Sequence, residues 1–337
     1  FLAAVADVCR RESVRMVVPV CEEIFTLSAG RENLPEGSRL WAADHTTLLK
    51  LHNKWTFIET ARAAGLPVPD TRLIQSAEDA GNLAGDWFLK PCYSRFAAAG
   101  RRWNTGDEKS KASDRKWLGR QAIGRDRRWV AQEFLTGSGW CATALADRGR
   151  VLVQASYPVE WTAGPGACVS FRAARHPGVE DWVARCVAAT GFTGQIAFDF
   201  VDVPGRGILP LECNPRGTSG LHLIPQAGRL ITQNWKSGGA GAGAEHGAET
   251  CYIGGGDPRH LSVPMLLYGL PESVRKGAAG EWLRAWRAGR EVTCAPGDAR
   301  PAWLGNAWTL AWFSKEAWRL RLGLTAATTA DLEWNGE

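Results

Sequence analysis

The sequence predicts an α/β protein with more than one domain, and three observations support this prediction. Residues 14–20 (VRMVVPV) form a near-continuous apolar run, which is typical of a strand buried on both faces of a sheet. Residues 44–64 repeat apolar side chains at helical spacing, whereas residues 195–203 and 208–213 form two strand-like segments around a Pro-Gly turn. A chain of 337 residues is also long enough for two domains.

The composition is that of an ordinary soluble globular protein. Hydrophobic residues make up 45% and charged residues 22%, a balance that excludes collagen, a coiled coil and wholesale disorder. No apolar stretch reaches the roughly 20 continuous residues that a membrane-spanning helix needs. The nine cysteines form no CxxC pair and show no zinc-ligand spacing, which argues against a disulfide framework and a structural metal. We therefore expect a cytoplasmic protein with no membrane partner.

The first 45 residues open with a helix that is followed by a strand. Residues 2–11 have the pattern of an amphipathic helix, and the apolar run at residues 14–20 comes next. A doubly wound α/β domain normally begins with a strand, so we expect residues 1–45 to be the remnant of a Rossmann-like domain. The chain begins with Phe1 and not with Met, and we expect its natural N-terminus to lie upstream.

The middle of the chain alternates between helix and strand patterns. We expect one helix over residues 44–64, ended by Gly65 and the prolines that follow it. A short strand at residues 87–91 ends in Lys90, whose side chain can leave the sheet there. The other predicted elements are a helix at residues 179–190 and strands at residues 130–135, 140–146, 151–157, 195–203 and 208–213.

A basic segment spans residues 101–128, with ten Lys or Arg residues against four Asp or Glu residues. This excess of six positive charges exceeds the net charge of +5 of the whole chain. Together with 17 tryptophans, it suggests nucleic-acid binding as one interpretation. We favour a solvated helix over residues 110–121 and helices packed by tryptophan, because the aromatic residues are spaced irregularly among the cations.

The residues with the clearest chemical meaning lie between positions 194 and 223. Asp199 is near the middle of one predicted strand, Glu212 ends the next, and Asn214 follows two residues later. Neighbouring antiparallel strands lie about 4.8 Å apart, so these oxygen ligands can converge on Mg²⁺ or Mn²⁺. Arg216 is placed to hold a phosphate with its planar guanidinium. The alternative interpretation is a set of buried acids paired with nearby arginines.

A loop of small residues follows this segment. Residues 217–220 can offer free backbone N–H groups to an anion, and we expect Ser219 and Gly220 to contact a second substrate. His222 follows the loop and either contacts that substrate or has a structural role.

The string Glu212-Cys-Asn-Pro-Arg216 resembles the end of the nucleotide-binding domain of ATP-grasp ligases, such as carbamoyl-phosphate synthetase large chains and biotin carboxylases. The resemblance continues upstream in the family's order, with Lys54, Lys90 and the strand at residues 130–135, and covers about residues 14–225. It implies two α+β subdomains that clamp ATP. We expect an ATP-grasp domain at residues 46–225 with a lid at about 85–135. A helical C-terminal extension at 226–337 would then contain a Gly/Ala-rich loop at 237–247.

The resemblance also implies roles for single residues. Lys54 and Lys90 would contact ATP phosphates, and Arg216 would contact the transferring phosphoryl group. Arg95 would assist at the phosphates, because the loop after Lys90 has few of the glycines that the family uses there. The metal ligands would be Asp199, Glu212 and Asn214. The adenine would lie against a hinge made of Gln132, Glu133, Phe134 and Leu135.

These features predict an ATP- and Mg²⁺-dependent ligase that joins a small-molecule carboxylate to an amine through an acyl phosphate, without a nucleic-acid partner. Gly139 stands where many family members carry a ribose-binding Glu, which keeps a non-catalytic ATP sensor as an alternative. A kinase-like phosphotransferase and a nucleic-acid-binding protein are also compatible with these residues.

Overall fold

The structure is a computed structural model of the 337-residue chain. It describes residues 1–94, 100–104, 108–121, 123–164, 166–236, 250–294, 297–298, 300–327 and 334. Arg95 and the Gly/Ala-rich loop at residues 237–247 lie outside the described residues.

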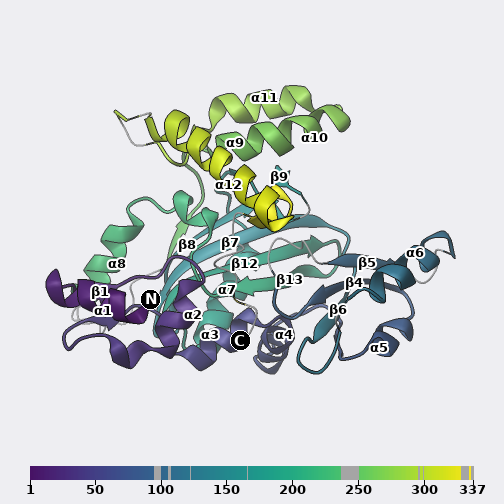
Figure 1. The fold of residues 1–337 in the computed structure, drawn as a ribbon, viewed down its shortest axis with the longest axis horizontal. Helices are drawn as coiled ribbons and strands as arrows, with labels where there is room; N and C mark the ends of the chain where they lie inside the picture. The colour runs from purple at the N-terminus through teal and green to yellow at the C-terminus, as the bar shows by residue number, and fades with distance from the viewer. Residues whose placement is uncertain are drawn as a thin grey trace.

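A five-stranded sheet forms the centre of the molecule, with the strand order β13-β12-β7-β8-β14 (Figure 1). All neighbouring strands are antiparallel except β14, which runs parallel to β8. The two predicted hairpins are confirmed as β7–β8 and β12–β13. The strands span Ser138–Asp147 (β7), Arg150–Pro158 (β8), Gly194–Val203 (β12), Gly207–Asn214 (β13) and Cys251–Ile253 (β14).

Four helices pack on one face of the central sheet and bury its largest core. They are α2 (Glu23–Ala29), α3 (His45–His52), α4 (Lys54–Ala63) and α7 (Pro177–Thr190). Phe57 of α4 and Trp182 of α7 contact Phe198 of β12 ring to ring. Because such rings bury large apolar areas, this aromatic cluster fixes α4 and α7 against the sheet.

Smaller elements cover the opposite face. They are η2 (Ser219–Leu223), α8 (Ala227–Lys236) and β11 (Ser170–Phe171). Leu223, Ile224 and Ile231 pack there with Leu145 and Val153 of the sheet. This face also carries the polar row described below, so η2 and the segment before it border the site.

A second sheet, ordered β3-β6-β4-β5, lies at one end of the molecule, in the part of the chain where the lid is expected (Figure 1). Trp87, Trp103 and Trp129 pack with Leu118 into a core of its own, which explains part of the tryptophan content. The sheet includes β3 and therefore begins before the expected residue 85. Its elements span Thr71–Ile74 (β3), Ala77–Gly81 (α5), Asp86–Pro91 (β4), Arg101–Asn104 (β5), Glu108–Leu118 (α6) and Trp129–Glu133 (β6).

The N-terminal segment begins with α1 (Leu2–Arg11), as predicted, and adds a small parallel pair, β1 (Met16–Val17) with β2 (Arg39–Leu40). The η1 turn (Arg31–Asn33) lies between them. The prediction of a strand over residues 14–20 is wrong in its length, since only two residues pair. Pro19 has no N–H to donate to a ladder, which explains why the strand does not continue.

The prediction of one helix over residues 44–64 is also wrong, because α3 ends before Asn53 and a second helix begins after it. The Asn53 side chain accepts hydrogen bonds from the N–H groups of Trp55 and Thr56, at 3.0 and 3.2 Å. Asn53 is therefore the N-cap of a new helix, α4.

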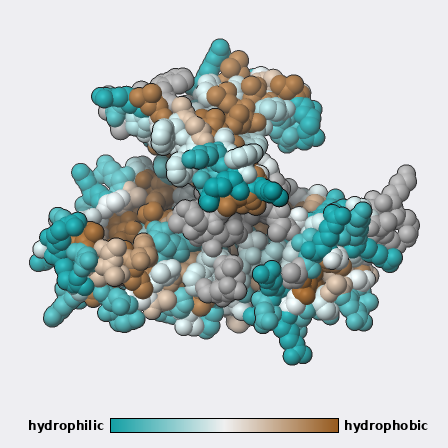
Figure 2. Space-filling view, viewed as in Figure 1, coloured by the Kyte–Doolittle hydropathy of each residue, from teal (hydrophilic) through white to brown (hydrophobic). Residues whose placement is uncertain are grey.

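The C-terminal region forms a separate helical layer, drawn at the top of Figure 1. Figure 2 shows hydrophobic residues gathered over this layer. No helix in the described part of the chain is long and apolar enough to cross a membrane. The helices span Ser262–Pro264 (α9), Met265–Gly269 (η3), Leu270–Arg275 (α10), Ala279–Ala288 (α11), Pro301–Gly305 (η4), Asn306–Leu320 (α12) and Leu324–Ala327 (α13). The short strands span Thr162–Ala163 (β9), Ala167–Cys168 (β10), Arg259–His260 (β15) and Arg290–Glu291 (β16).

Candidate active site

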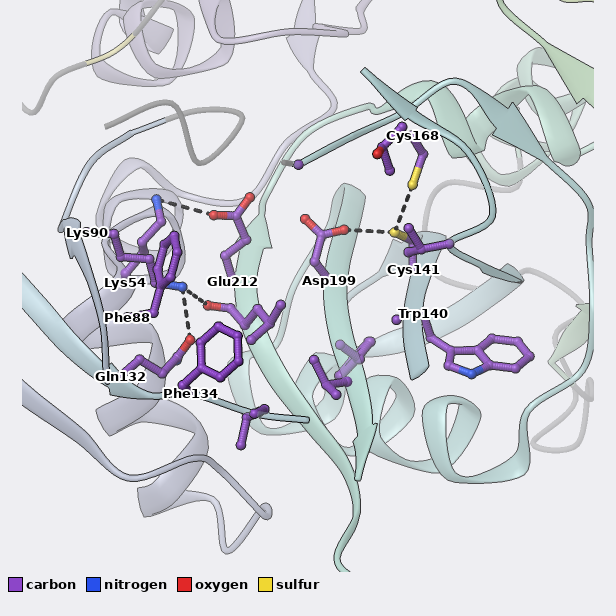
Figure 3. Close-up of a pocket in the computed structure, with 18 of the residues that line it drawn as sticks. Lys54, Phe88, Lys90, Gln132, Phe134, Trp140, Cys141, Cys168, Asp199 and Glu212 are labelled. Carbon is purple, nitrogen blue, oxygen red and sulfur yellow. Dashed lines mark hydrogen bonds and ion pairs between the residues drawn. The ribbon is translucent and has the colours of Figure 1, made fainter. Parts of the chain in front are cut away.

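Four side chains form a row across one face of the central sheet. The strand register pairs Tyr157 of β8 with Cys141 of β7, Cys141 with Asp199 of β12, and Asp199 with Glu212 of β13. Directly opposed residues in antiparallel strands present their side chains on the same face, roughly 5 Å apart. The register therefore brings the two predicted metal-binding carboxylates together, as Figure 3 shows.

Asn214, the third predicted metal ligand, ends β13. It lies two residues beyond Glu212, and alternate residues of a strand share one face. Asn214, Asp199 and Glu212 line the same cavity.

Lys90 lies at the end of β4, and its ammonium group reaches from the lid to the central sheet. The side-chain nitrogen Nζ donates to Gln132 Oε1 on β6 at 3.0 Å and to the Leu211 carbonyl on β13 at 2.9 Å. Burial lowers the pKa of Lys90 to about 8, although the nearby Glu212 carboxylate opposes this shift. Lys90 thus links the two sheets at the site.

Lys54 is the first residue of α4, so the N-cap at Asn53 fixes where its side chain starts. Lys54 Nζ donates to the Ser94 carbonyl at 2.8 Å and lies 3.4 Å from Glu212 Oε2. The structure therefore places both predicted phosphate-binding lysines beside Glu212.

The two carboxylates ionise differently because their neighbours differ. Burial and the adjacent Glu212 raise the pKa of Asp199 to about 7. Burial acts in the same direction on Glu212, but the charges of Lys54 and Lys90 outweigh it and lower the pKa of Glu212 to about 2. Near neutral pH the pair therefore contains one ionised carboxylate beside one that is partly protonated.

Two adjoining cavities meet at this row of side chains. The first cavity, of about 320 Å³, is lined by Lys54, Lys90 and residues of the lid and central sheet. The second cavity, of about 550 Å³, is lined by Asn214, Arg216 and residues from the segment around η2. Five residues line both cavities, which makes them the boundary between the two: Cys141, Gly166, Cys168, Asp199 and Glu212.

The predicted hinge lies along the first cavity. All four of its residues line the cavity wall: Gln132, Glu133, Phe134 and Leu135. The Glu133 carboxylate has a structural partner, because it accepts hydrogen bonds from both terminal nitrogens of Arg206, at 2.7 and 2.8 Å. These bonds lower the pKa of Glu133 and explain why a carboxylate is tolerated at this strand end.

Gly139 lines the same cavity from β7. A Cβ atom added there would lie 3.1 Å from Val159, so the site has little room for a larger residue. Val159 therefore packs against Gly139 at the wall of the first cavity.

Arg216 lies buried at the second cavity, where its guanidinium contacts Asn214, Gly217 and Glu22. Its terminal nitrogens donate to Asn214 Oδ1 and to the Gly217 carbonyl, each at 3.1 Å. Its Nε lies 3.3 Å from Glu22 Oε1. Glu22 is buried as well and accepts a hydrogen bond from the Trp334 N–H at 2.5 Å. Glu22 and Trp334, which are far apart in the sequence, therefore contribute to the position of Arg216.

Two of the three residues predicted to contact a second substrate, Ser219 and His222, line the second cavity. Burial, together with the charge of Arg259, lowers the pKa of His222 and favours its neutral form. Gly220 packs on Tyr157, where an added Cβ would lie 2.8 Å from the ring. Glycine at this position lets η2 approach the sheet closely.

The donor set at the boundary fits a hard divalent cation. Two carboxylates and one amide supply oxygen atoms. The buried Asp199 carboxyl lies beside Glu212, and a bound cation would remove the repulsion between the two carboxylates. In the described part of the chain, no group of three or more His, Cys, Asp or Glu side chains is arranged to hold a metal. The other ligands of such an ion would be phosphate and water oxygens.

Some residues at the site were not predicted from the sequence, among them Cys141, Cys168 and Glu22. Cys141 donates its S–H to Asp199 Oδ1 at 3.0 Å, and Cys168 Sγ lies 3.8 Å from Cys141 Sγ. The alternation of residues in the predicted hairpin would have indicated the face of Cys141. No local signal in the sequence connects Glu22 with Arg216, because their contact depends on how distant segments pack.

No family model matches the sequence, and no curated protein matches it either. Solved structures do match the fold. A β,γ-ATP complex of biotin carboxylase from Campylobacter jejuni aligns with 68% of this chain and 56% of its own length, with a TM-score of 0.54 and 12% identity. The ADP complex of an N5-carboxyaminoimidazole ribonucleotide synthetase aligns with 67% of this chain and 59% of its own length, with a TM-score of 0.52 and 15% identity.

A third match is the biotin carboxylase domain of 2-oxoglutarate carboxylase from Hydrogenobacter thermophilus, bound to MgADP. It covers 65% of this chain and 52% of its own length, with a TM-score of 0.52 and 13% identity. The chain therefore spans less than two thirds of each of these structures. The chain has the ATP-grasp fold, which confirms the fold predicted from the sequence.

Proposed function

We propose that the protein is an ATP- and Mg²⁺-dependent ligase that joins a small-molecule carboxylate to an amine, or a similar nucleophile, through an acyl phosphate. The observation that best supports this proposal is the meeting of two cavities at Asp199 and Glu212. Lysines flank the first cavity and suit a polyphosphate, whereas the guanidinium at the second suits a carboxylate or phosphoryl group. A group passing between two bound molecules would cross at this boundary.

The hinge side of the first cavity would bind the base. Phe88, Val201 and Leu211 line it together with the hinge residues, which gives the cavity a largely apolar wall for a flat ring. The fold neighbours were solved with ATP- or ADP-type ligands, and this supports ATP as the nucleotide. With Gly139 in place of a carboxylate, we expect the ribose to be held by water or by another residue.

The reaction that we propose has two steps. A substrate carboxylate oxygen attacks the γ-phosphorus, the bond from that phosphorus to the β-phosphate oxygen breaks, and ADP leaves. The amine nitrogen then attacks the acyl carbon, the carbon–oxygen bond to phosphate breaks, and the nitrogen loses its proton. Such phosphoryl transfer depends mainly on positioning and charge neutralisation.

Residues of this chain supply that positioning. Lys54 and Lys90 would hold the phosphates, and Arg216 would span two oxygens of the transferring group. Asp199, Glu212 and Asn214 would hold Mg²⁺ or Mn²⁺, which supplies further charge neutralisation at the phosphates. All nine cysteines are free thiols, which supports the reducing cytoplasm as the proposed location.

The experiment that tests this function measures ADP release by the natural full-length protein, supplied with Mg²⁺-ATP and pools of carboxylic acids and amines. Release that requires both an acid and an amine is the expected result. Release with an alcohol or acid alone, giving a stable phosphorylated product, would indicate a phosphotransferase. Tight ATP binding without turnover in any pool would indicate the sensor instead.

A further inference from the structure

We propose that Cys141 and Cys168 form an oxidisable thiol pair, and that a disulfide between them disables the site. The formation of the disulfide is independent of the proposed function, whereas its effect on turnover rests on that function. The ligand class that such a pair accepts is a low-molecular-weight disulfide, such as oxidised glutathione.

The geometry brings two thiols from separate elements into contact. Cys141 lies on β7 and Cys168 on β10, and their sulfur atoms are 3.8 Å apart (Figure 3). A disulfide needs a sulfur–sulfur distance of roughly 2 Å, so the two atoms must approach by somewhat less than 2 Å. Cys168 lies on a two-residue strand, and we expect a movement of its side chain to close this gap.

The position of the pair would make its oxidation consequential. Both cysteines line both cavities, and the Cys141 S–H donates to Asp199. A disulfide removes that S–H, so Asp199 loses its donor at the boundary. It would also fasten β10 to β7, and β10 follows Gly166, which lines both cavities. Oxidation therefore changes both the carboxylate and the wall beside it.

The exposure of the two thiols determines which of them reacts first with the small disulfide. Cys168 is half-buried, whereas Cys141 is only 6% exposed, so a small oxidant meets Cys168 first. Cys168 loses its proton, and the resulting thiolate attacks one sulfur of the small disulfide and expels a small thiolate, which takes up that proton; a mixed disulfide on Cys168 remains. The Cys141 sulfur then attacks Cys168 Sγ, the bond to the small thiol's sulfur breaks, and the Cys141 proton passes to the departing small thiolate. Two protein thiols and one small disulfide thus give one protein disulfide and two small thiols.

The test treats the protein with oxidised glutathione, blocks the remaining thiols, and identifies cross-linked peptides by mass spectrometry. A peptide that joins Cys141 to Cys168 and is lost on reduction is the expected result. Cys251 is exposed and serves as the control for accessibility alone. Only a glutathione adduct on Cys168, or cross-links that do not include the pair, would overturn the proposal, and this readout needs no enzymatic activity.

The consequence is tested by comparing each protein with its own reduced form. Wild type and Cys251→Ser should lose at least tenfold in Mg²⁺-ATP affinity or turnover when oxidised, and regain it with a reducing thiol. After the same treatment, Cys168→Ser should keep the full affinity and turnover of its own reduced form. Equal losses in Cys168→Ser and wild type would refute the disabling effect. If no turnover is found in any protein, the proposed function fails, while the cross-link and the nucleotide affinity still decide the switch.

Discussion

At the scale of single residues, Asp199 and Glu212 are chemically similar groups in adjacent strands whose pKa values move in opposite directions. The lysines lie beside Glu212, whereas Asp199 has a thiol as its hydrogen-bond donor. Asp199 is therefore held in an unfavourable state in the absence of a cation, which is typical of groups that serve binding at the cost of stability.

We expect Asp199→Asn to stabilise the metal-free protein. A carboxyl group whose pKa is raised from 3.8 to about 7 by folding costs stability increasingly as the pH rises from about 4 to about 7, and the cost is constant above that. Because one pKa unit corresponds to about 1.4 kcal/mol, a half-buried group should give a gain of at least about 1 kcal/mol at pH 8. Urea unfolding should show a smaller gain at pH 5, and an equal gain at both pH values would contradict this account.

Lys90 gives a prediction about nucleotide binding. Burial lowers its pKa to about 8, so its charge is lost as the pH rises through that value. We expect ATP affinity, measured by calorimetry, to fall between pH 7 and 9 in the wild type. Lys90→Met should bind ATP about 1.5–3 kcal/mol more weakly at pH 7, as for one charge-assisted contact, and should vary less with pH. Unchanged affinity in this variant would transfer the phosphate contact to Lys54.

At the scale of elements, the sequence is sufficient to predict an element whose conformation is set by residues adjacent in the chain. The β7–β8 hairpin was predicted from its alternation and turn residues, and Arg148 and Gly149 both adopt the positive φ that its tight turn requires. The helix break at Asn53 was missed because an asparagine inside an apolar helical pattern has two interpretations, and only the packed structure shows the cap.

The cap at Asn53 leads to a prediction about stability. Asn53→Ala removes the acceptor of two backbone N–H groups at the start of α4 and should lower the free energy of unfolding by about 1 kcal/mol. Asn53→Ser retains a capping oxygen and should recover most of that loss in urea titrations. If the alanine and serine variants were equally destabilised, the role of the cap in fixing Lys54 would be refuted.

The tryptophans show where the packing predicted from helical spacing differs from the packing in the structure. Packing by tryptophan is confirmed in the lid and in α11, where Trp282 stacks on Trp286. The prediction of packing by tryptophan is wrong for α12, because Trp308, Trp312 and Trp318 are at least half exposed. Helical spacing predicts which residues share a face, but it does not show whether another element covers that face.

At the scale of the whole molecule, the site depends on segments that are far apart in sequence. The ATP-grasp fold and the residues of the β12–β13 hairpin were predictable, because the resemblance follows the order of short motifs. The contact of Glu22 with Arg216, and that of Trp334 with Glu22, arises only when the N-terminal segment docks on the sheet. Sequence spacing contains no information on such a contact.

This contact predicts a role for Glu22 in positioning Arg216. Glu22→Gln keeps the shape but removes the charge that faces the guanidinium at 3.3 Å. We expect turnover to fall at least tenfold while ATP affinity, set in the first cavity, changes less than about twofold. The free energy of unfolding should also fall by on the order of 3 kcal/mol, because a buried pair loses one partner.

Glu59→Gln is the matched control for this variant. Glu59 pairs with Arg62 on the exposed side of α4, and its loss should change stability by no more than about 0.5 kcal/mol. If Glu22→Gln affected ATP affinity and turnover equally, Glu22 would have a general structural role and not a positioning role.

The most direct test of the central claim follows oxygen from the substrate to phosphate. Once the ADP-release assay has identified the carboxylate, that substrate is labelled with ¹⁸O in its carboxylate group, and the released phosphate is analysed by mass spectrometry. Transfer from the first cavity to the second through an acyl phosphate predicts one ¹⁸O atom in each phosphate released. Phosphate without label, or AMP in place of ADP, would contradict the acyl-phosphate route and the roles assigned to the two cavities.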